Sequence, residues 1–278
     1  LDRSVTVHGT EEWGLPAAHD DDVMVALLQI SHRSSWAKRI EFSRYELCQL
    51  LRWSMGGPSY DRIYKALHRL STTTYNYRYA WRDHSQEQWI PSQIFSYIQS
   101  LKVHEVDRPT RSGRCEVTWS DDFHQSLLAG SLKRLDYDLF VSLKSPIAKR
   151  LYRFLDKRFG LIQRNSKGRC VCYTRDLHTL AFEKIGISRS YKDAAQIKRV
   201  LRPAIRELEE VGFLATESQE RRFQRVRRGQ WMIHFRKKQP QRKRWNDPPK
   251  DTQTQNPDSV AETRPRVRKK RKAWPQGK

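Results

Sequence analysis

Residues 191–236 read YKDAAQIKRVLRPAIRELEEVGFLATESQERRFQRVRRGQWMIHFR. The first half predicts a helix, because apolar side chains gather on one face at about 100° per residue. We assign that face to the core, and it consists of Ile197, Leu201, Ala204, Ile205, Leu208 and Val211. Gly212, Phe213 and Leu214 then turn into a strand, and residues 231–235 alternate as a returning strand. The stretch therefore predicts a helix followed by two strands that a basic loop joins.

The opposite face of this helix is basic. It carries Lys198, Arg199, Arg202 and Arg206, and it turns acidic at Glu209 and Glu210. A helix that enters a DNA groove needs this division, with one side anchored in its domain and the other offering cations and donors. We therefore expect the N-terminal half to read bases. The simpler alternative is an amphipathic helix with a solvated charged face.

Pro203 lies inside this predicted helix, where a proline removes one backbone hydrogen bond and clashes with the preceding turn. We expect a kink or a break near residues 199–202. Alternatively, Pro203 is the first residue of a new helix, although Arg202 would then be a poor cap.

Five arginines lie within eight positions between the two predicted strands. They are Arg221, Arg222, Arg225, Arg227 and Arg228. Such a density of guanidinium groups is costly against protein and natural against phosphates or in a narrow minor groove. A loop kept basic for solubility is the alternative. Because a recognition-helix pattern lies just upstream, we favour DNA contact.

The residues upstream complete a unit. Residues 145–159 predict a helix with apolar side chains at helical spacing, and a loop over residues 160–168 follows. A short strand around Val171 leads to a helix over residues 174–185, which Gly186 is placed to end. Helix, strand, helix, helix and a basic hairpin is the order of a winged-helix unit.

A similar order occurs nearer the N-terminus. The carboxylates of Asp20, Asp21 and Asp22 suit the start of a helix, because they interact favourably with its macrodipole. Helices over residues 43–54 and 59–70 follow, with a turn at residues 56–58 and Ser59 as N-cap. Strand-like runs then occupy residues 73–81, 89–98, 103–106 and 115–119.

The third helix of this first unit has the same two faces at lower charge. Its buried face consists of Ile63, Leu67 and Leu70, and its basic face consists of Arg62, Lys65 and Arg69. Tyr60 and Tyr64 lie between the faces, where aromatic residues more often pack than touch phosphates or sugars.

The sequence thus predicts an α+β fold of two tandem winged-helix domains, over residues 14–135 and 136–236. Residues 237–278 hold 14 Lys and Arg against 4 Asp and Glu, with six of the twelve Pro. That segment cannot bury enough apolar surface to offset the entropy of ordering. We expect it to form a disordered basic tail.

Composition limits the function. The 278 residues contain 54 Lys and Arg against 31 Asp and Glu, a formal net charge of +23, which favours nucleic acid as the partner. No apolar run is long enough to span a bilayer, and four cysteines are too few for a disulfide scaffold. We therefore expect a cytoplasmic protein without membrane association. The chain begins at Leu1, so we expect a start within a longer product or at an unusual start codon.

Catalysis has no positive support in the sequence. The G-x-x-x-x-G-K-[ST] pattern and any His-x-His pair are missing, which argues against a P-loop ATPase and a metal-dependent nicking enzyme. Cys170 and Cys172 with His178 fall outside the usual zinc spacings, so buried or strand cysteines are the simpler interpretation. Asp121 and Asp122 suit a helix start better than an acid–base pair. We expect no enzyme activity, cofactor or metal.

Three segments resemble the replication initiator proteins of bacterial plasmids, especially the group called replication initiator protein A. Residues 56–74 are similar to the G-x-x-Y-x-R-[IL]-x-x-A-L-x-R-L-x-x-T stretch of that group. Residues 145–155 are similar to its S-x-x-[AE]-[KR]-R-L-Y-x-x-[LA] helix. Residues 198–208 match the [RK]-x-x-L-x-P-A-[IV]-x-E-[IL] pattern of the wider family, which accounts for Pro203.

The resemblance covers residues 14 to about 236 and leaves the tail unexplained. It implies a protein that binds repeated sites in a plasmid origin, helps to melt an adjacent AT-rich segment, and recruits the host initiator and replicative helicase. The second unit would make the main contacts with double-stranded DNA. The first unit would add contacts and support a homodimer, which in such proteins often represses its own promoter.

Two other classes share some of these features. A winged-helix transcriptional regulator with no replication role would share every DNA-binding feature, whereas a DNA relaxase would also nick its substrate. The two winged units and the helix that contains Leu151 and Tyr152 favour the initiator.

Overall fold

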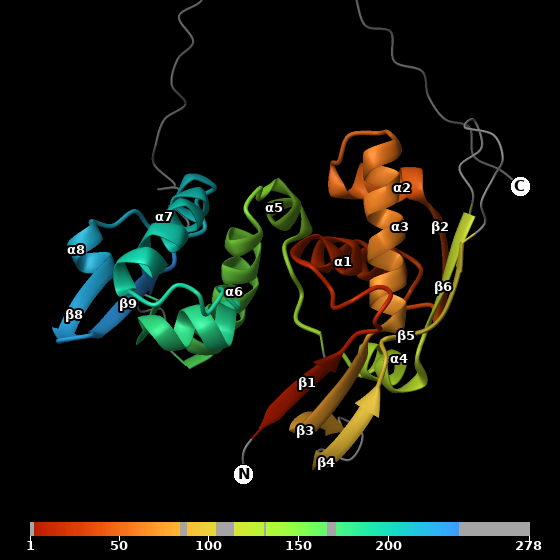
Figure 1. The fold of residues 1–278 in the computed structure, drawn as a ribbon, viewed down its shortest axis with the longest axis horizontal. Coiled ribbons are helices and arrows are strands. Elements are labelled where there is room, and N and C mark those ends of the chain that lie inside the picture. The colour runs from red at the N-terminus through yellow and green to blue at the C-terminus, as the bar shows by residue number, and fades with distance from the viewer. Residues whose placement is uncertain (1–2, 84–87, 104–113, 131, 166–170, 239–278) are drawn as a thin grey trace, which may run out of the picture. The chain divides into compact units, whose positions relative to one another are not determined.

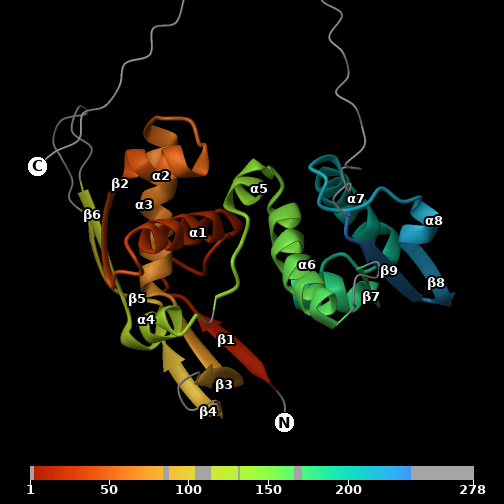
Figure 2. The same ribbon diagram turned by 180° about the vertical axis from the view of Figure 1, so that it is seen from behind.

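The computed structural model describes residues 3–83, 88–103, 114–130, 132–165 and 171–238, which Figures 1 and 2 show from opposite sides. These residues form helices and antiparallel strands in two successive winged-helix units, so the predicted α+β fold class is confirmed. The prediction of a basic tail falls almost entirely outside the described residues.

The first unit has the order helix, strand, helix, helix, strand, strand. Its elements are α1 (Ala18–Arg33), β2 (Arg39–Ser43), α2 (Arg44–Leu51), α3 (Gly57–Thr72), β5 (Ile98–Val103) and β6 (Arg114–Trp119). The strands form an antiparallel sheet in the order β2-β6-β5, so the first strand of the unit pairs with its last. The sequence pattern does not predict β2, and it places β5 several residues too late.

The second unit repeats this topology. Its elements are α6 (Pro146–Asn165), β7 (Cys172–Asp176), the π-helix η1 (Thr179–Ile185), α7 (Ala194–Glu210), α8 (Gln219–Arg222), β8 (Phe223–Arg227) and β9 (Gln230–Arg236). The sheet order is β7-β9-β8, and again the first strand pairs with the last. The two units are therefore a structural repeat, in which α3 and α7 are the corresponding third helices.

A separate antiparallel sheet belongs to the N-terminal part of the chain. It consists of β1 (Ser4–His8), β3 (Thr74–Asp83) and β4 (Gln88–Phe95) in the order β1-β3-β4. Strands β3 and β4 are inserted between α3 and β5. Their order along the chain suggested that residues 74–95 form strands of the winged-helix sheet, and that expectation is wrong. The alternating pattern identifies a strand but not its partner, and β3 pairs with residues 4–8.

Each unit has its own apolar core. Leu27, Leu67 and Trp119 lie in the first core, whereas Leu151 and Leu201 lie in the second. Helices α4 (Asp121–Leu128) and α5 (Tyr137–Ser142) follow the first unit, and α5 contributes Phe140 to the second core. As expected, Asp121 and Asp122 lie in the first turn of α4.

Three predicted helix boundaries are wrong, each for a physical reason. Helix α3 begins before Ser59, because Pro58 suits a first turn and Gly56 is the N-cap. Helix α6 continues through Gly160, because Ile162 packs against the core. Residues 174–176, where the predicted helix begins, belong to strand β7 instead, since β7 pairs with β9 along all five of its residues.

Helix α7 is continuous through Pro203, so a break and the alternative of a new helix are both wrong, whereas the expected kink stays a prediction. Leu201, Ala204 and Ile205 on either side of the proline are buried in the core, which holds the helix together. Val211 is 39 % exposed, because it is the C-cap and lies past the regular helix.

Acidic residues at the start of α1 pair with basic residues from elsewhere in the chain. As predicted, Asp20 caps the helix, accepting a hydrogen bond from the backbone N–H of Ala17 at 2.6 Å. Asp22 pairs with Lys149 of α6 at 2.8 Å. Asp21 pairs with two further α6 cations, Arg153 at 2.7 Å and Arg150 at 3.6 Å. Asp21 and Asp22 therefore link α1 to α6, the first helices of the two units.

Candidate nucleic-acid interface

Helix α7 divides into the two predicted faces. Ile197, Leu201 and Leu208 are fully buried against the second core. Arg199, Arg202 and Arg206 are exposed. The core contacts fix the orientation of the helix, so the three arginines point away from the domain.

Strands β8 and β9 form a hairpin, which we call the wing, and α7 lies against it (Figure 1). The turn contains Gly229 with a φ of +79°, a conformation that favours glycine. The sequence pattern predicts a loop for all five arginines, but Arg225 and Arg227 lie in β8 and Arg228 lies at the turn. The wing is thus a β-hairpin with arginines on its first strand, and its register shifts between Arg225 and Arg227.

Seven exposed arginines of α7, α8 and the wing form what we call the arginine surface. They are Arg199, Arg202, Arg206, Arg221, Arg225, Arg227 and Arg228. Arg202 donates a hydrogen bond from Nε to Gln219 Oε1 at 3.0 Å. In the described part of the chain, no carboxylate lies within ion-pair distance of any of the seven. Their charges are therefore available to an anionic partner.

Arg222 has a different place from its neighbours, because it is 1 % exposed at the base of the wing. Its guanidinium pairs with Glu209 and Glu217 and donates to the carbonyl oxygens of His234 at 2.8 Å and Ala215 at 2.9 Å. Arg222 thus joins α7 to the wing, and its DNA contact stays a prediction from the sequence. Glu209 faces this arginine instead of the outer surface.

Lys198 is also buried, although the helical wheel placed it on the basic face. Its ammonium lies 2.7 Å from the centroid of the Trp231 ring and 5.4 Å from that of Phe223. Burial, followed by the nearby charges of Arg202 and Arg225, lowers the pKa of Lys198 to about 8. The wheel misses this contact because it describes one helix without the strands packed on it.

In the first unit, α3 keeps two of its three predicted cations exposed. Arg62 and Lys65 are exposed, and Arg62 lies over the Trp53 ring at 5.1 Å. Arg69 instead pairs with the fully buried Asp20 through Nε at 2.6 Å and Nη2 at 2.9 Å. Arg69 is thus engaged by a structural partner, and its DNA contact stays a prediction from the sequence.

The tyrosines of α3 pack, as the simpler interpretation predicted. Tyr64 contacts His68, with ring centroids 4.4 Å apart, and Trp13 stacks on the same imidazole at 4.4 Å. Tyr60 packs against the first core.

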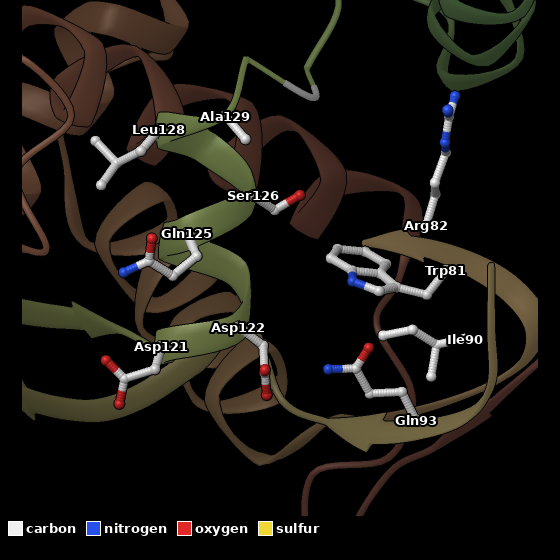
Figure 3. Close-up of a pocket in the computed structure, with 10 residues that line it drawn as sticks. All are labelled: Trp81, Arg82, Ile90, Gln93, Asp121, Asp122, Gln125, Ser126, Leu128 and Ala129. Atoms are coloured by element: carbon white, nitrogen blue, oxygen red, sulfur yellow. The ribbon is translucent and has the colours of Figure 1, made fainter. Parts of the chain in front are cut away.

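A surface hollow of about 610 Å³ lies between the β3–β4 hairpin and α4 (Figure 3). Asp121 and Asp122 line it from the helix, and Trp81 and Gln93 line it from the hairpin. Arg82 points away from the two carboxylates in Figure 3. The hollow therefore presents two carboxylates among neutral polar and apolar groups, with Arg82 directed away from them, and is a poor site for a polyanion.

No metal or membrane site emerges from the part of the chain that the structure describes. Cys172 is exposed on β7, while Cys170 lies outside the described residues. Among the described side chains, no group of His, Cys, Asp and Glu could hold a metal ion. None of the described helices is long and apolar enough to cross a membrane.

Fold and surface together define a tandem winged-helix protein with a basic face on the third helix and wing of its second unit. The chain belongs to the replication initiator protein A family, whose model matches residues 1–206. That match includes residues 194–206 of α7, about three quarters of the helix, and ends before the wing.

Two further comparisons concern a curated relative and a solved structure. The chain is 26 % identical over 153 residues to the plasmid replication initiator protein TrfA of Escherichia coli, which is 55 % of this chain and 37 % of that protein. The match therefore spans little more than a third of that relative. Domains 2 and 3 of RctB superpose with a TM-score of 0.52 at 12 % identity, covering 86 % of this chain and 88 % of that one. This likeness concerns the fold alone.

Proposed function

We propose that this protein is a plasmid replication initiator that binds double-stranded DNA sequence-specifically at repeated origin sites. Family membership supports the replication role. The observation that carries DNA binding is the arginine surface, where seven exposed guanidinium groups have no described carboxylate partner. In this proposal α7 enters the major groove, with Arg199 and Arg202 on base edges, and the wing arginines contact phosphates.

The first unit would add a second contact through Arg62 and Lys65 of α3, which corresponds to α7 in the repeat. We retain the domain boundary between residues 135 and 136 as part of this proposal, and the burial of Phe140 in the second core supports it. Origin melting, a homodimer, and recruitment of the host initiator and replicative helicase complete the proposed role.

Footprinting on the DNA that flanks its own gene tests this function. An initiator should protect several sites at regular spacing beside an AT-rich segment, and that segment should become sensitive to single-strand probes. A single protected palindrome at a promoter, without melting, would instead identify a transcriptional regulator. Nicking of supercoiled origin DNA in the presence of Mg²⁺ would contradict the non-enzymatic role.

A further inference from the structure

Lys198 bridges the third helix of the second unit and both strands of the wing. Its ammonium lies over Trp231 of β9, and Phe223 of β8 is close by. The residue keeps 8 % of its surface exposed. Aromatic faces attract a cation, yet they replace only part of the hydration that burial removes.

The charges of two further cations act on this ammonium, and no carboxylate of the described residues pairs with it. Arg202 lies one turn further along α7, and Arg225 is opposite Trp231 in the β8–β9 ladder. The carboxylates of Glu209 and Glu217 at the base of the wing are paired with Arg222.

The other titratable side chains of β9 are also engaged elsewhere. His234 hydrogen-bonds Thr174, and Arg236 pairs with Glu217. Three positive charges thus converge between helix and wing without an anion among the described residues. This is an unfavourable arrangement that a bound anion would relieve.

We propose that Lys198 and Arg225 form a subsite for one backbone phosphate of DNA, beside the base-reading Arg202, and that filling this subsite takes up a proton. The inference rests on the proposed function and adds to it a regulatory property, which is that duplex affinity falls as the pH becomes mildly alkaline.

The direction of this pH dependence follows because DNA binding and protonation of Lys198 are thermodynamically linked. The pKa of Lys198 is lowered to about 8 in the free protein, whereas a phosphate beside it would raise that pKa in the complex. Below pH 8 the lysine is charged in both states, and the affinity is insensitive to pH. Above pH 8 the free lysine is largely neutral and must gain a proton on binding. The affinity should therefore fall by about tenfold between pH 7 and pH 9.

Fluorescence anisotropy with the full chain and an origin duplex, at constant ionic strength from pH 6.5 to 9.5, tests this. We expect the dissociation constant of the unmodified protein to rise about tenfold between pH 7 and pH 9. Lys198→Arg should bind equally well over that range, because arginine stays charged. Lys198→Met should be weak at every pH. Lys192→Met, at an exposed lysine just before α7, should keep the original pH dependence.

Calorimetry in buffers of different ionisation enthalpy gives a second measurement. Binding at pH 8 should take up about half a proton per subsite for the unmodified protein and none for either Lys198 variant. Thermal midpoints at each pH show whether a variant is folded.

The possible results distinguish failure of the Lys198 subsite from failure of the proposed DNA-binding function. Salt-sensitive duplex binding that is flat between pH 7 and pH 9, or a Lys198→Arg protein that keeps the pH dependence, would overturn the subsite and leave the function intact. No duplex binding at any pH would overturn both.

Discussion

Arg199 and Arg202 lie on the exposed face of α7 and differ from Arg225 and Arg227, which lie on a strand of the wing. In our account the first pair reads bases and the second holds phosphates. A bidentate arginine on guanine contributes roughly 1 to 3 kcal/mol of discrimination, whereas a phosphate contact strengthens binding to every sequence about equally.

Changing Arg199 or Arg202 to Ala should therefore collapse the preference for the specific site. Changing Arg225 or Arg227 to Ala should weaken binding to specific and random duplexes evenly. Competition anisotropy with both duplexes measures the ratio of the two affinities.

The control for these variants is Arg158→Ala, which removes an exposed arginine of α6 outside the arginine surface. It should leave both affinities nearly unchanged. If Arg199→Ala and Arg202→Ala both keep the full ratio of specific to random affinity, α7 does not read bases, and Arg62 and Lys65 become the next candidates.

Arg222 shows how a charged residue in the same run serves stability. Changing it to Ala would leave the largely buried Glu209 without its cation and Glu217 with Arg236 alone, and losing one partner of a buried pair costs about 3 to 5 kcal/mol. Urea denaturation should show that loss. Arg221→Ala, at the exposed neighbour, should change the free energy of unfolding by no more than about 0.5 kcal/mol. Equal effects of the two substitutions would contradict the assigned roles.

Among the elements, those with a strong local signal could be predicted from the sequence. Helix α7 has an apolar face that only a helix would gather, and α3 has a similar face, so both appear with the right polarity. Strands β1 and β2 carry weaker signals. They are five residues each, and their partners lie about 70 residues away along the chain. Pairing with a distant strand produces no periodic pattern in the local sequence.

The residues of the candidate site also divide into those that the sequence predicts and those whose position depends on tertiary contacts. The exposed arginines of α7 and the wing follow from spacing alone, and their locations need no tertiary information. The burial of Arg222, Lys198 and Arg69 depends on what packs beside each one. Their partners Glu217, Trp231 and Asp20 come from other elements. A helical wheel cannot include these contacts.

Pro203 offers a test at the scale of one helix. It lies exposed in the middle of α7 and cannot donate a hydrogen bond to the carbonyl of Arg199. Pro203→Ala restores that donor, and it should raise the free energy of unfolding by about 1 to 3 kcal/mol. Equilibrium denaturation provides the measurement. A neutral or lower stability would mean that the packing of Leu201 and Ala204 depends on the shape that the proline imposes.

For the whole molecule, both cores lie between residues 23 and 235, so residues 239–278 should be dispensable for folding. They hold 12 Lys and Arg against 4 Asp and Glu. Deleting them should leave the thermal midpoint nearly unchanged, while binding to random duplex weakens because phosphate contacts are lost. Calorimetry and anisotropy measure the two effects. A large fall in the midpoint would show that this segment packs on the folded units.

The central claim is that the arginine surface binds the phosphates and bases of duplex DNA. The salt dependence of affinity for an origin duplex tests it most directly, because each phosphate that the protein neutralises adds about 0.9 to the magnitude of the slope. With seven exposed arginines, two of them assigned to bases, we predict that the logarithm of the association constant falls with the logarithm of salt at a slope of about −4 to −6. A slope near zero would contradict the account.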